Sequence, residues 1–170
     1  MKIRIILLQL LLLFVLGTAQ AQKFGHINVG NILVLMPETK GADSLLQIYQ
    51  DSLVAIGESR ADSLKNDILA FSKDYNEGLL TPKQAQTKQA ELEKRHQGIL
   101  AYEQQVQNLV AMKREELLTP ILEKLQKAID EVGKEGGYYM IFDTSVVNTI
   151  LYAQESDDLA PLVKKKLGIE

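Results

Sequence analysis

The chain has 170 residues and a formal net charge of −3, with 19 Lys and Arg residues against 22 Asp and Glu residues. It contains no cysteine, which excludes disulfide bonds and cysteine metal sites. The acidic balance argues against a general nucleic-acid binder, because such proteins present a strongly positive surface.

The first 21 residues have the pattern of a secretory signal peptide. Lys2 and Arg4 precede an apolar run from Ile5 to Leu16, and Ala19-Gln20-Ala21 places small residues where a signal peptidase reads them. A membrane anchor is the alternative, but the run is short for a span. We expect cleavage after Ala21 and an exported, single-domain chain of residues 22–170, which carries 17 basic and 22 acidic side chains.

A strand is expected immediately after the cleavage site. Residues 24–29 are the candidate, with Gly25, Ile27 and Val29 on one face. Apolar residues 32–36 then predict a short turn or helix before Pro37.

A long helix is predicted from Pro37 onward, because apolar residues recur at steps of three and four. Ala42, Leu53, Leu64 and Tyr75 are spaced eleven residues apart, about 3.67 residues per turn, which favours a nearly straight stripe. About 40 helical residues would make a rod of order 60 Å.

The helix is predicted to stop and restart within residues 76–82. Gly78 suits the left-handed position after a helix, and Thr81 suits the N-cap of the next one. Pro82 fits the first helical position, and Gln84 completes a capping box with Thr81. A second helix should run from Pro82 to about Lys134, with a bend near Pro120.

Two strands and a short helix are expected in the remaining residues. Residues 138–142 are apolar on both faces, residues 149–153 form the second candidate strand, and Asp143 caps the loop between them. Asp158 is expected to cap a last helix, Leu159 to Leu167, whose C-terminal lysines match the helix dipole. Three short strands leave exposed edges, so we expect several chains to share one sheet.

No arrangement of residues indicates catalysis. His26 and His96 lie far apart in the sequence, and no phosphate-binding loop or nucleophile elbow is present. Asp157-Asp158 is interpreted as a helix start. We therefore predict that the protein is not an enzyme and has no cofactor or metal.

Three stretches resemble the Skp/OmpH family of periplasmic chaperones: "FGHINVGNILVLMPE", "LLTPILEKLQKAIDEVGKEGGYYMIFDTS" and "ILYAQESDDLAPLVKKKL". The resemblance covers essentially all of residues 22–170. It implies an α+β, mainly helical fold in which a long antiparallel helical hairpin (37–135, a coiled-coil arm) projects from a small β body (22–36 and 136–170). It also implies a homotrimer in which residues 138–143 pair with the N-terminal strand of the same chain.

The function that the resemblance implies is that of an ATP-independent holdase. Such a chaperone binds unfolded outer-membrane proteins in the periplasm and prevents their aggregation. A structural coiled-coil scaffold of the envelope, binding one folded partner, is the alternative. A nucleic-acid or anion binder using Lys164–Lys166 is weaker, and transient contact with the membrane surface stays open.

Site residues are predicted for both parts of the fold. The candidates for client contact are Phe71, Tyr75, Leu79, Leu80 and Tyr102, with packing between arm helices as the alternative, which we favour for Phe71 and Tyr75. The candidates for the trimer body are Ile27, Val29, Tyr139, Ile141 and Leu151. Residues 38–134 carry 13 Lys and Arg against 16 Asp and Glu, so the electrostatic capture and lipopolysaccharide site of basic family members are not transferred to this chain.

Overall fold

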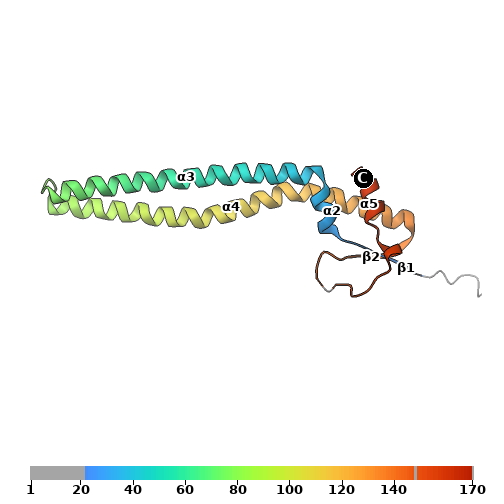
Figure 1. The fold of residues 1–170 in the computed structure, drawn as a ribbon. Coiled ribbons are helices and arrows are strands. Elements are labelled where there is room, and N and C mark those ends of the chain that lie inside the picture. The colour runs from blue at the N-terminus through green and yellow to red at the C-terminus, as the bar shows by residue number, and fades with distance from the viewer. Residues whose placement is uncertain (1–21, 148, 170) are drawn as a thin grey trace, which may run out of the picture. The chain divides into compact units, whose positions relative to one another are not determined.

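The computed structural model describes residues 22–147 and 149–169, so the predicted signal peptide lies outside the described residues. The elements in chain order are β1 (Lys23–Ile27), α2 (Val29–Leu35), α3 (Pro37–Asn76), α4 (Pro82–Gly136), β2 (Tyr138–Asp143), the 3-10 helix η2 (Glu155–Asp157) and α5 (Ala160–Leu167) (Figure 1). Long helices with a small sheet confirm the predicted fold class. The described chain divides into two compact units, residues 33–124, which we call the arm, and residues 22–32 with 125–169, which we call the body.

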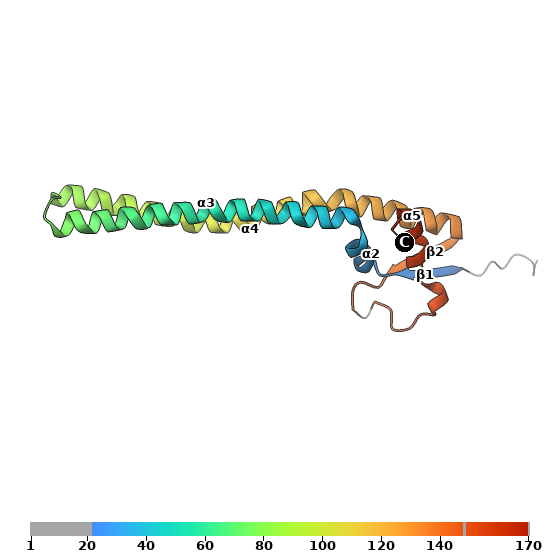
Figure 2. The same ribbon diagram turned by 45° about the horizontal axis from the view of Figure 1, so that its top comes forward.

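The arm is an antiparallel hairpin of α3 and residues 82–124 of α4, which lie side by side in both views (Figures 1 and 2). Ala42, Leu53 and Leu64 are buried, so these three positions of the predicted eleven-residue stripe lie on the packed face of α3, whereas the fourth, Tyr75, is exposed. Four side chains of α4 are buried within the same unit: Ala85, Leu92, Tyr102 and Ile121. Both long helices were predicted within two residues of their observed ends, because their apolar periodicity and caps are local signals.

The turn between α3 and α4 has the predicted chemistry. Gly78 has a φ of 71°, and its N–H donates to the carbonyl of Tyr75 at 3.1 Å. The N–H of Leu79 donates to the carbonyl of Asp74 at 3.0 Å, and together these bonds form a Schellman motif. At the start of α4 the Thr81 N–H donates to Gln84 Oε1 at 2.9 Å, and the Gln84 N–H donates to Thr81 Oγ1 at 3.3 Å. This reciprocal pair is the capping box.

Ion pairs also join the two arm helices. Arg95 of α4 pairs with Asp67 of α3, and Lys124 pairs with Glu38. The hydrogen bond from Lys124 lowers the pKa of Glu38. Such partly exposed pairs each add little stability, so burial of the apolar stripe is the main stabilising contribution in the arm.

The body contains a two-stranded parallel sheet. Gly25 of β1 lies opposite Ile141 of β2, and Ile27 lies opposite Asp143. The predicted pairing of residues 138–143 with the N-terminal strand of the same chain is therefore confirmed. Parallel strands need a long crossover, and here the connection contains α2, α3 and α4.

The body core is formed by apolar side chains from β1, α2, the end of α4 and α5. Its buried members are Ile27, Ile32, Leu125, Ala128, Ile129, Val132, Leu159 and Val163. Glycine at position 25 permits this packing, because a Cβ there would lie 2.6 Å from Leu159 Cδ1.

Two predictions about strands were wrong. Val29 does not extend β1 but begins α2, because Asn28 Oδ1 accepts the N–H of Asn31 at 2.8 Å and so caps a helix. Residues 149–153 do not form a strand. A strand needs a partner for its backbone groups, and the side of β1 away from β2 is already bridged by Asp158 at His26.

The last helix begins one residue later than predicted, at Ala160. Asp158 Oδ1 accepts the Ala160 N–H at 2.9 Å, so the predicted capping residue does bind the first helical turn. Lys166, in the last turn, pairs with Glu135 at 2.6 Å and with Glu131 at 3.5 Å. The hydrogen bond from Glu135 raises the pKa of Lys166.

Candidate functional site

Exposed apolar side chains occur along the arm, and they include Tyr75 and Leu79 at its end. Tyr75 is 61% exposed and stacks on the half-buried Phe71, with ring centroids 5.9 Å apart. Leu79 is 65% exposed in the turn, and Leu80 is half-buried. We call Phe71, Tyr75, Leu79 and Leu80 the tip patch. The Schellman motif fixes the backbone of Leu79, so its side chain remains in solvent at a defined turn.

Tyr102 has a different environment from the other predicted client residues. It is 8% exposed, and its hydroxyl donates to the backbone carbonyl of Leu53 at 3.1 Å. The guanidinium of Arg60 lies 4.2 Å from the centroid of its ring. Burial between the arm helices argues against client contact by Tyr102, so it is not part of the tip patch.

The five residues predicted for the trimer body are not brought together on one surface. Ile27 is in the core of its own chain, and Val29 is half-buried at the start of α2. Ile141 is half-buried, with its Cδ1 atom 3.2 Å from where a Cβ of Gly133 would lie, so it packs on α4. Tyr139 and Leu151 are exposed, the latter by 89%.

Tyr139 belongs to an aromatic surface on the sheet, of which the sequence analysis did not predict the other two members, Phe24 and Phe142. The ring of Phe24 lies 6.3 Å from that of Tyr139 and 6.4 Å from that of Phe142, and all three side chains are exposed. These aromatic residues belong to strands that could be predicted from the sequence. The alternation of side chains along a strand shows which residues share a face, but not which face another segment will cover.

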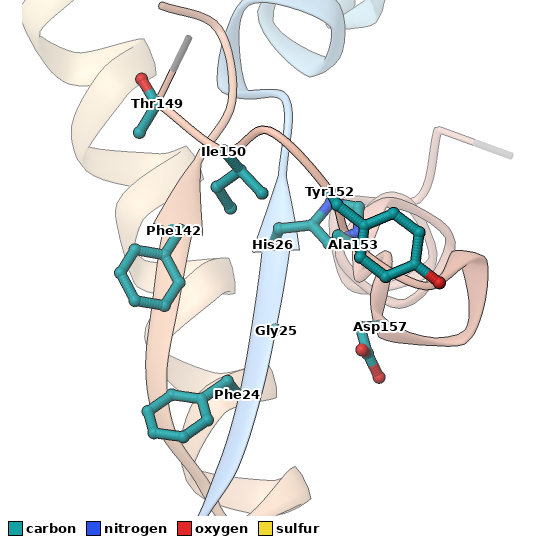
Figure 3. A pocket seen from close by; sticks show the side chains of 9 residues that line it. All are labelled: Phe24, Gly25, His26, Phe142, Thr149, Ile150, Tyr152, Ala153 and Asp157. Atoms are coloured by element: carbon teal, nitrogen blue, oxygen red, sulfur yellow. The ribbon is translucent and has the colours of Figure 1, made fainter.

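A hollow of about 340 Å³ adjoins this surface (Figure 3). Phe24, His26 and Phe142 line it from the strands, and Ile150 and Tyr152 line it from the following loop. His26 Nε2 lies 3.4 Å from the carbonyl oxygen of Gln154, in the same loop. Tyr152 is 83% exposed, and Val146 and Val147 are also exposed. We call the exposed side chains of Phe24, Tyr139, Phe142 and Tyr152 the body patch.

The titratable residues were also compared with the geometry of a metal site. Within residues 22–147 and 149–169, no group of three His, Asp or Glu residues is arranged to hold a metal ion. In the same described part of the chain, every helix is too short or too polar to cross a membrane. His96 is exposed on the arm, as a solvated helix residue is expected to be.

Comparison with known proteins gives a family for this fold. A comparison with curated proteins found no significant match. The chain resembles a crystal structure of a candidate outer membrane chaperone (OmpH-like) from Caulobacter crescentus, with a TM-score of 0.71 and 15% sequence identity over 87% of this chain and 85% of the other. At that identity the likeness concerns the fold. Residues 23–167 match the family described as outer membrane protein (OmpH-like). The chain therefore belongs to the OmpH-like outer membrane protein family, as its resemblance to the Skp/OmpH chaperones predicted.

Proposed function

We propose that this protein is an ATP-independent holdase chaperone that binds unfolded outer-membrane proteins and prevents their aggregation. Membership of the OmpH-like family and the likeness to a candidate chaperone support the proposal. The observation that carries it is the tip patch, where Tyr75 and Leu79 are held in solvent at a defined turn. Large apolar side chains held in solvent on a well-formed element are typical of a protein-binding surface.

Holding would depend on many weak apolar contacts. Full burial of a Leu or Phe side chain is worth roughly 1.5–3 kcal/mol, so a few partial contacts bind reversibly and exchange quickly. The acidic balance of residues 38–134 makes electrostatic capture of acidic clients unfavourable. Apolar segments of a client, rather than its charges, would therefore be the feature that is recognised.

The proposal includes a homotrimer assembled through the body. Leu151 and Tyr152 are almost fully exposed in the single chain, and Tyr152 lines the hollow together with Phe24 and Phe142. Among the described residues β2 pairs with β1 alone, which leaves its other edge open to a strand or loop of a second copy. Burial of the body patch against further copies would cover both the apolar side chains and the open edge.

Export to the periplasm belongs to the same proposal. Cleavage after Ala21 would release residues 22–170 as a single domain, with the arm between the two segments of the body. Transient contact with the membrane surface is compatible with the exposed tip patch and is a subordinate part of the proposal.

The experiment is light scattering after dilution of a urea-unfolded outer-membrane barrel protein into buffer that contains residues 22–170. An unrelated coiled coil of equal net charge serves as the control. Suppressed scattering at a stoichiometric ratio of trimer to client is expected. Aggregation equal to that with the control would overturn the proposal and favour a scaffold that binds a folded partner.

A further inference from the structure

Cleavage after Ala21 would leave Gln22 as the first residue of the chain. A glutamine at this position has two groups that can react with each other, its own α-amine and its own side-chain amide. Attack of the amine on the Cδ atom closes a five-membered ring, whereas the shorter asparagine would have to close a strained four-membered one. The cleavage that is expected for export therefore also creates a reactive first residue.

Gln22 lies outside the sheet that follows it. The register of the sheet begins with Lys23 opposite Tyr138, and Gln22 is an exposed residue without regular secondary structure. A residue within the ladder would have its backbone dihedral angles fixed by the neighbouring strand. Ring closure requires rotation of the amine and the side chain about the Cα atom, and an unpaired first residue in solvent has this freedom.

The next residue, Lys23, is held in place within the body. Its Nζ atom donates to the carbonyl of Gly136 at 3.2 Å and lies 4.0 Å from the centroid of the Tyr138 ring. Gly136 is the last residue of α4, where the helix dipole favours a positive charge. In the cleaved chain the free part before the sheet is therefore a single residue, Gln22.

We propose that Gln22 of the exported chain is converted to pyroglutamate, which makes it a modification site of the body. The inference rests on the export and cleavage that belong to the proposed function, but not on chaperone activity. In the reaction the uncharged α-amine attacks Cδ, a bond forms between the α-nitrogen and Cδ, and the bond from Cδ to Nε2 breaks. Nε2 leaves as ammonia with the proton that the α-nitrogen loses, so no oxidant or other co-reactant is required.

The conditions for this reaction are met without a catalytic site. Both reacting groups belong to one residue, so the reaction is intramolecular and begins from a high effective concentration. Only the uncharged amine is nucleophilic. Because an α-amine has an ordinary pKa of about 7.7–8.0, part of the population is uncharged near neutral pH.

Ring closure would change the start of the body in two ways. It removes the positive charge of the α-amine, as acetylation of an N-terminus does, one residue before the Lys23 ammonium. It also removes the free amine that an aminopeptidase needs, one residue before β1 begins. An unblocked chain could lose Lys23 and, with it, the contacts to Gly136 and Tyr138. The modification would thus protect the first residue of β1 from trimming.

The test is the intact mass of the protein, expressed as residues 1–170 in a Gram-negative host, purified from the periplasm and incubated at neutral pH. We expect the mass of residues 22–170 less one molecule of ammonia. Fragmentation of the N-terminal peptide must locate the loss at Gln22, because the chain contains other glutamines. An added aminopeptidase should leave this chain intact.

Gln22→Ala is the matched control, because alanine keeps a free α-amine but has no side-chain amide. Its mature chain should keep its full mass and lose its first residues to the aminopeptidase. A parent chain that begins with Gln22 and keeps its full mass after incubation would overturn the modification and leave the proposed export intact. A chain that begins at any other residue would overturn the predicted cleavage as well. Light scattering tests the proposed holdase activity separately from either result.

Discussion

The carboxylate of Asp143, the last residue of β2, accepts a hydrogen bond of 3.2 Å from the backbone N–H of Val29, the first residue of α2. The same Oδ1 atom accepts the Ser145 N–H at 2.8 Å, and Oδ2 accepts the Ser145 hydroxyl at 2.7 Å. One side chain thus joins the end of one strand to the helix that follows the other.

This arrangement predicts a loss of body stability in acid. Lost hydration raises the pKa of Asp143, but the hydrogen bonds from Ser145 and Val29 outweigh this effect and lower the pKa overall. Because the pKa is lower in the folded state, the Asp143 carboxylate stabilises the body fully at pH values above its ordinary pKa of about 3.9. This contribution to the free energy of unfolding is lost as the pH falls through the folded-state pKa. Urea denaturation should show a constant contribution from neutral pH to about pH 5 and a falling one below about pH 4.

Asp143→Asn is the variant that isolates this carboxylate. Because the site is exposed and screened by solvent, we expect the variant to lose about 0.5–1 kcal/mol of its free energy of unfolding at neutral pH. Its free energy of unfolding should then fall less in acid than that of the parent. Asp62→Asn, at an exposed position on the arm, is the control and should retain the parent profile. Identical acid profiles for parent and Asp143→Asn would contradict the prediction.

Gly25→Ala should destabilise the body. Its new Cβ would lie 2.6 Å from Leu159 Cδ1 and 2.9 Å from Leu159 Cγ, so the buried Leu159 side chain must shift within the core. Overpacking of this kind costs about 1–3 kcal/mol in the free energy of unfolding, which urea denaturation measures.

Gly30→Ala is the matched control, because its Cβ would meet Asn28 Oδ1 at 3.4 Å and Ser145 Cβ at 3.5 Å, distances that helical alanine can accept. In a double-mutant cycle, Gly25→Ala with Leu159→Ala should cost less than the sum of the single changes. Strict additivity would show that the two side chains do not compete for the same space.

Replacement of both leucines of the tip patch, Leu79→Asp with Leu80→Asp, should weaken client holding severalfold, because it removes apolar contact and adds charge. The oligomer should remain intact, as sedimentation would show. Gln86→Asp with Gln89→Asp adds the same charge at exposed polar positions of α4 and should leave holding unchanged. Loss of the oligomer in the leucine variant would sink the assignment of these residues to client contact.

Leu151→Asp should dissociate the proposed trimer without unfolding the chain. Leu151 is almost fully exposed in the single chain, so a charge there costs little until another copy covers it. Ile141→Asp is a poorer probe, because Ile141 packs near Gly133 and its replacement would also damage the chain's own body. Sedimentation measures the oligomeric state of the Leu151→Asp variant. Ser156→Asp is the control, because it adds equal charge at an exposed polar residue. A trimer in both variants would place Leu151 outside the interface.

Local interactions explain why the arm could be predicted closely. A helix forms its hydrogen bonds within four residues, and the signals that start and stop it are equally local. Gly78 ended α3 and the Thr81–Gln84 capping box began α4 as the residue types alone implied. A short run of residues that are apolar on both faces likewise indicated a strand at 138–142.

Tertiary structure decided the environment of individual side chains. Tyr102 and Tyr75 have the same chemistry and both lie on arm helices, yet one is buried against Leu53 and the other is exposed near the turn. Periodicity shows that a helix has an apolar face, but not which side chains the partner helix reaches.

What the sequence determined by itself is the order and type of the helices, together with the family to which the chain belongs. Only the tertiary structure decided that Val29 begins a helix, that residues 149–153 do not form a strand, and that Asp143 binds a backbone group 114 positions away. The physical reason is that a strand, an edge or a hydrogen-bonded carboxylate depends on a partner brought from elsewhere in the chain, and no local pattern of residues specifies which partner arrives.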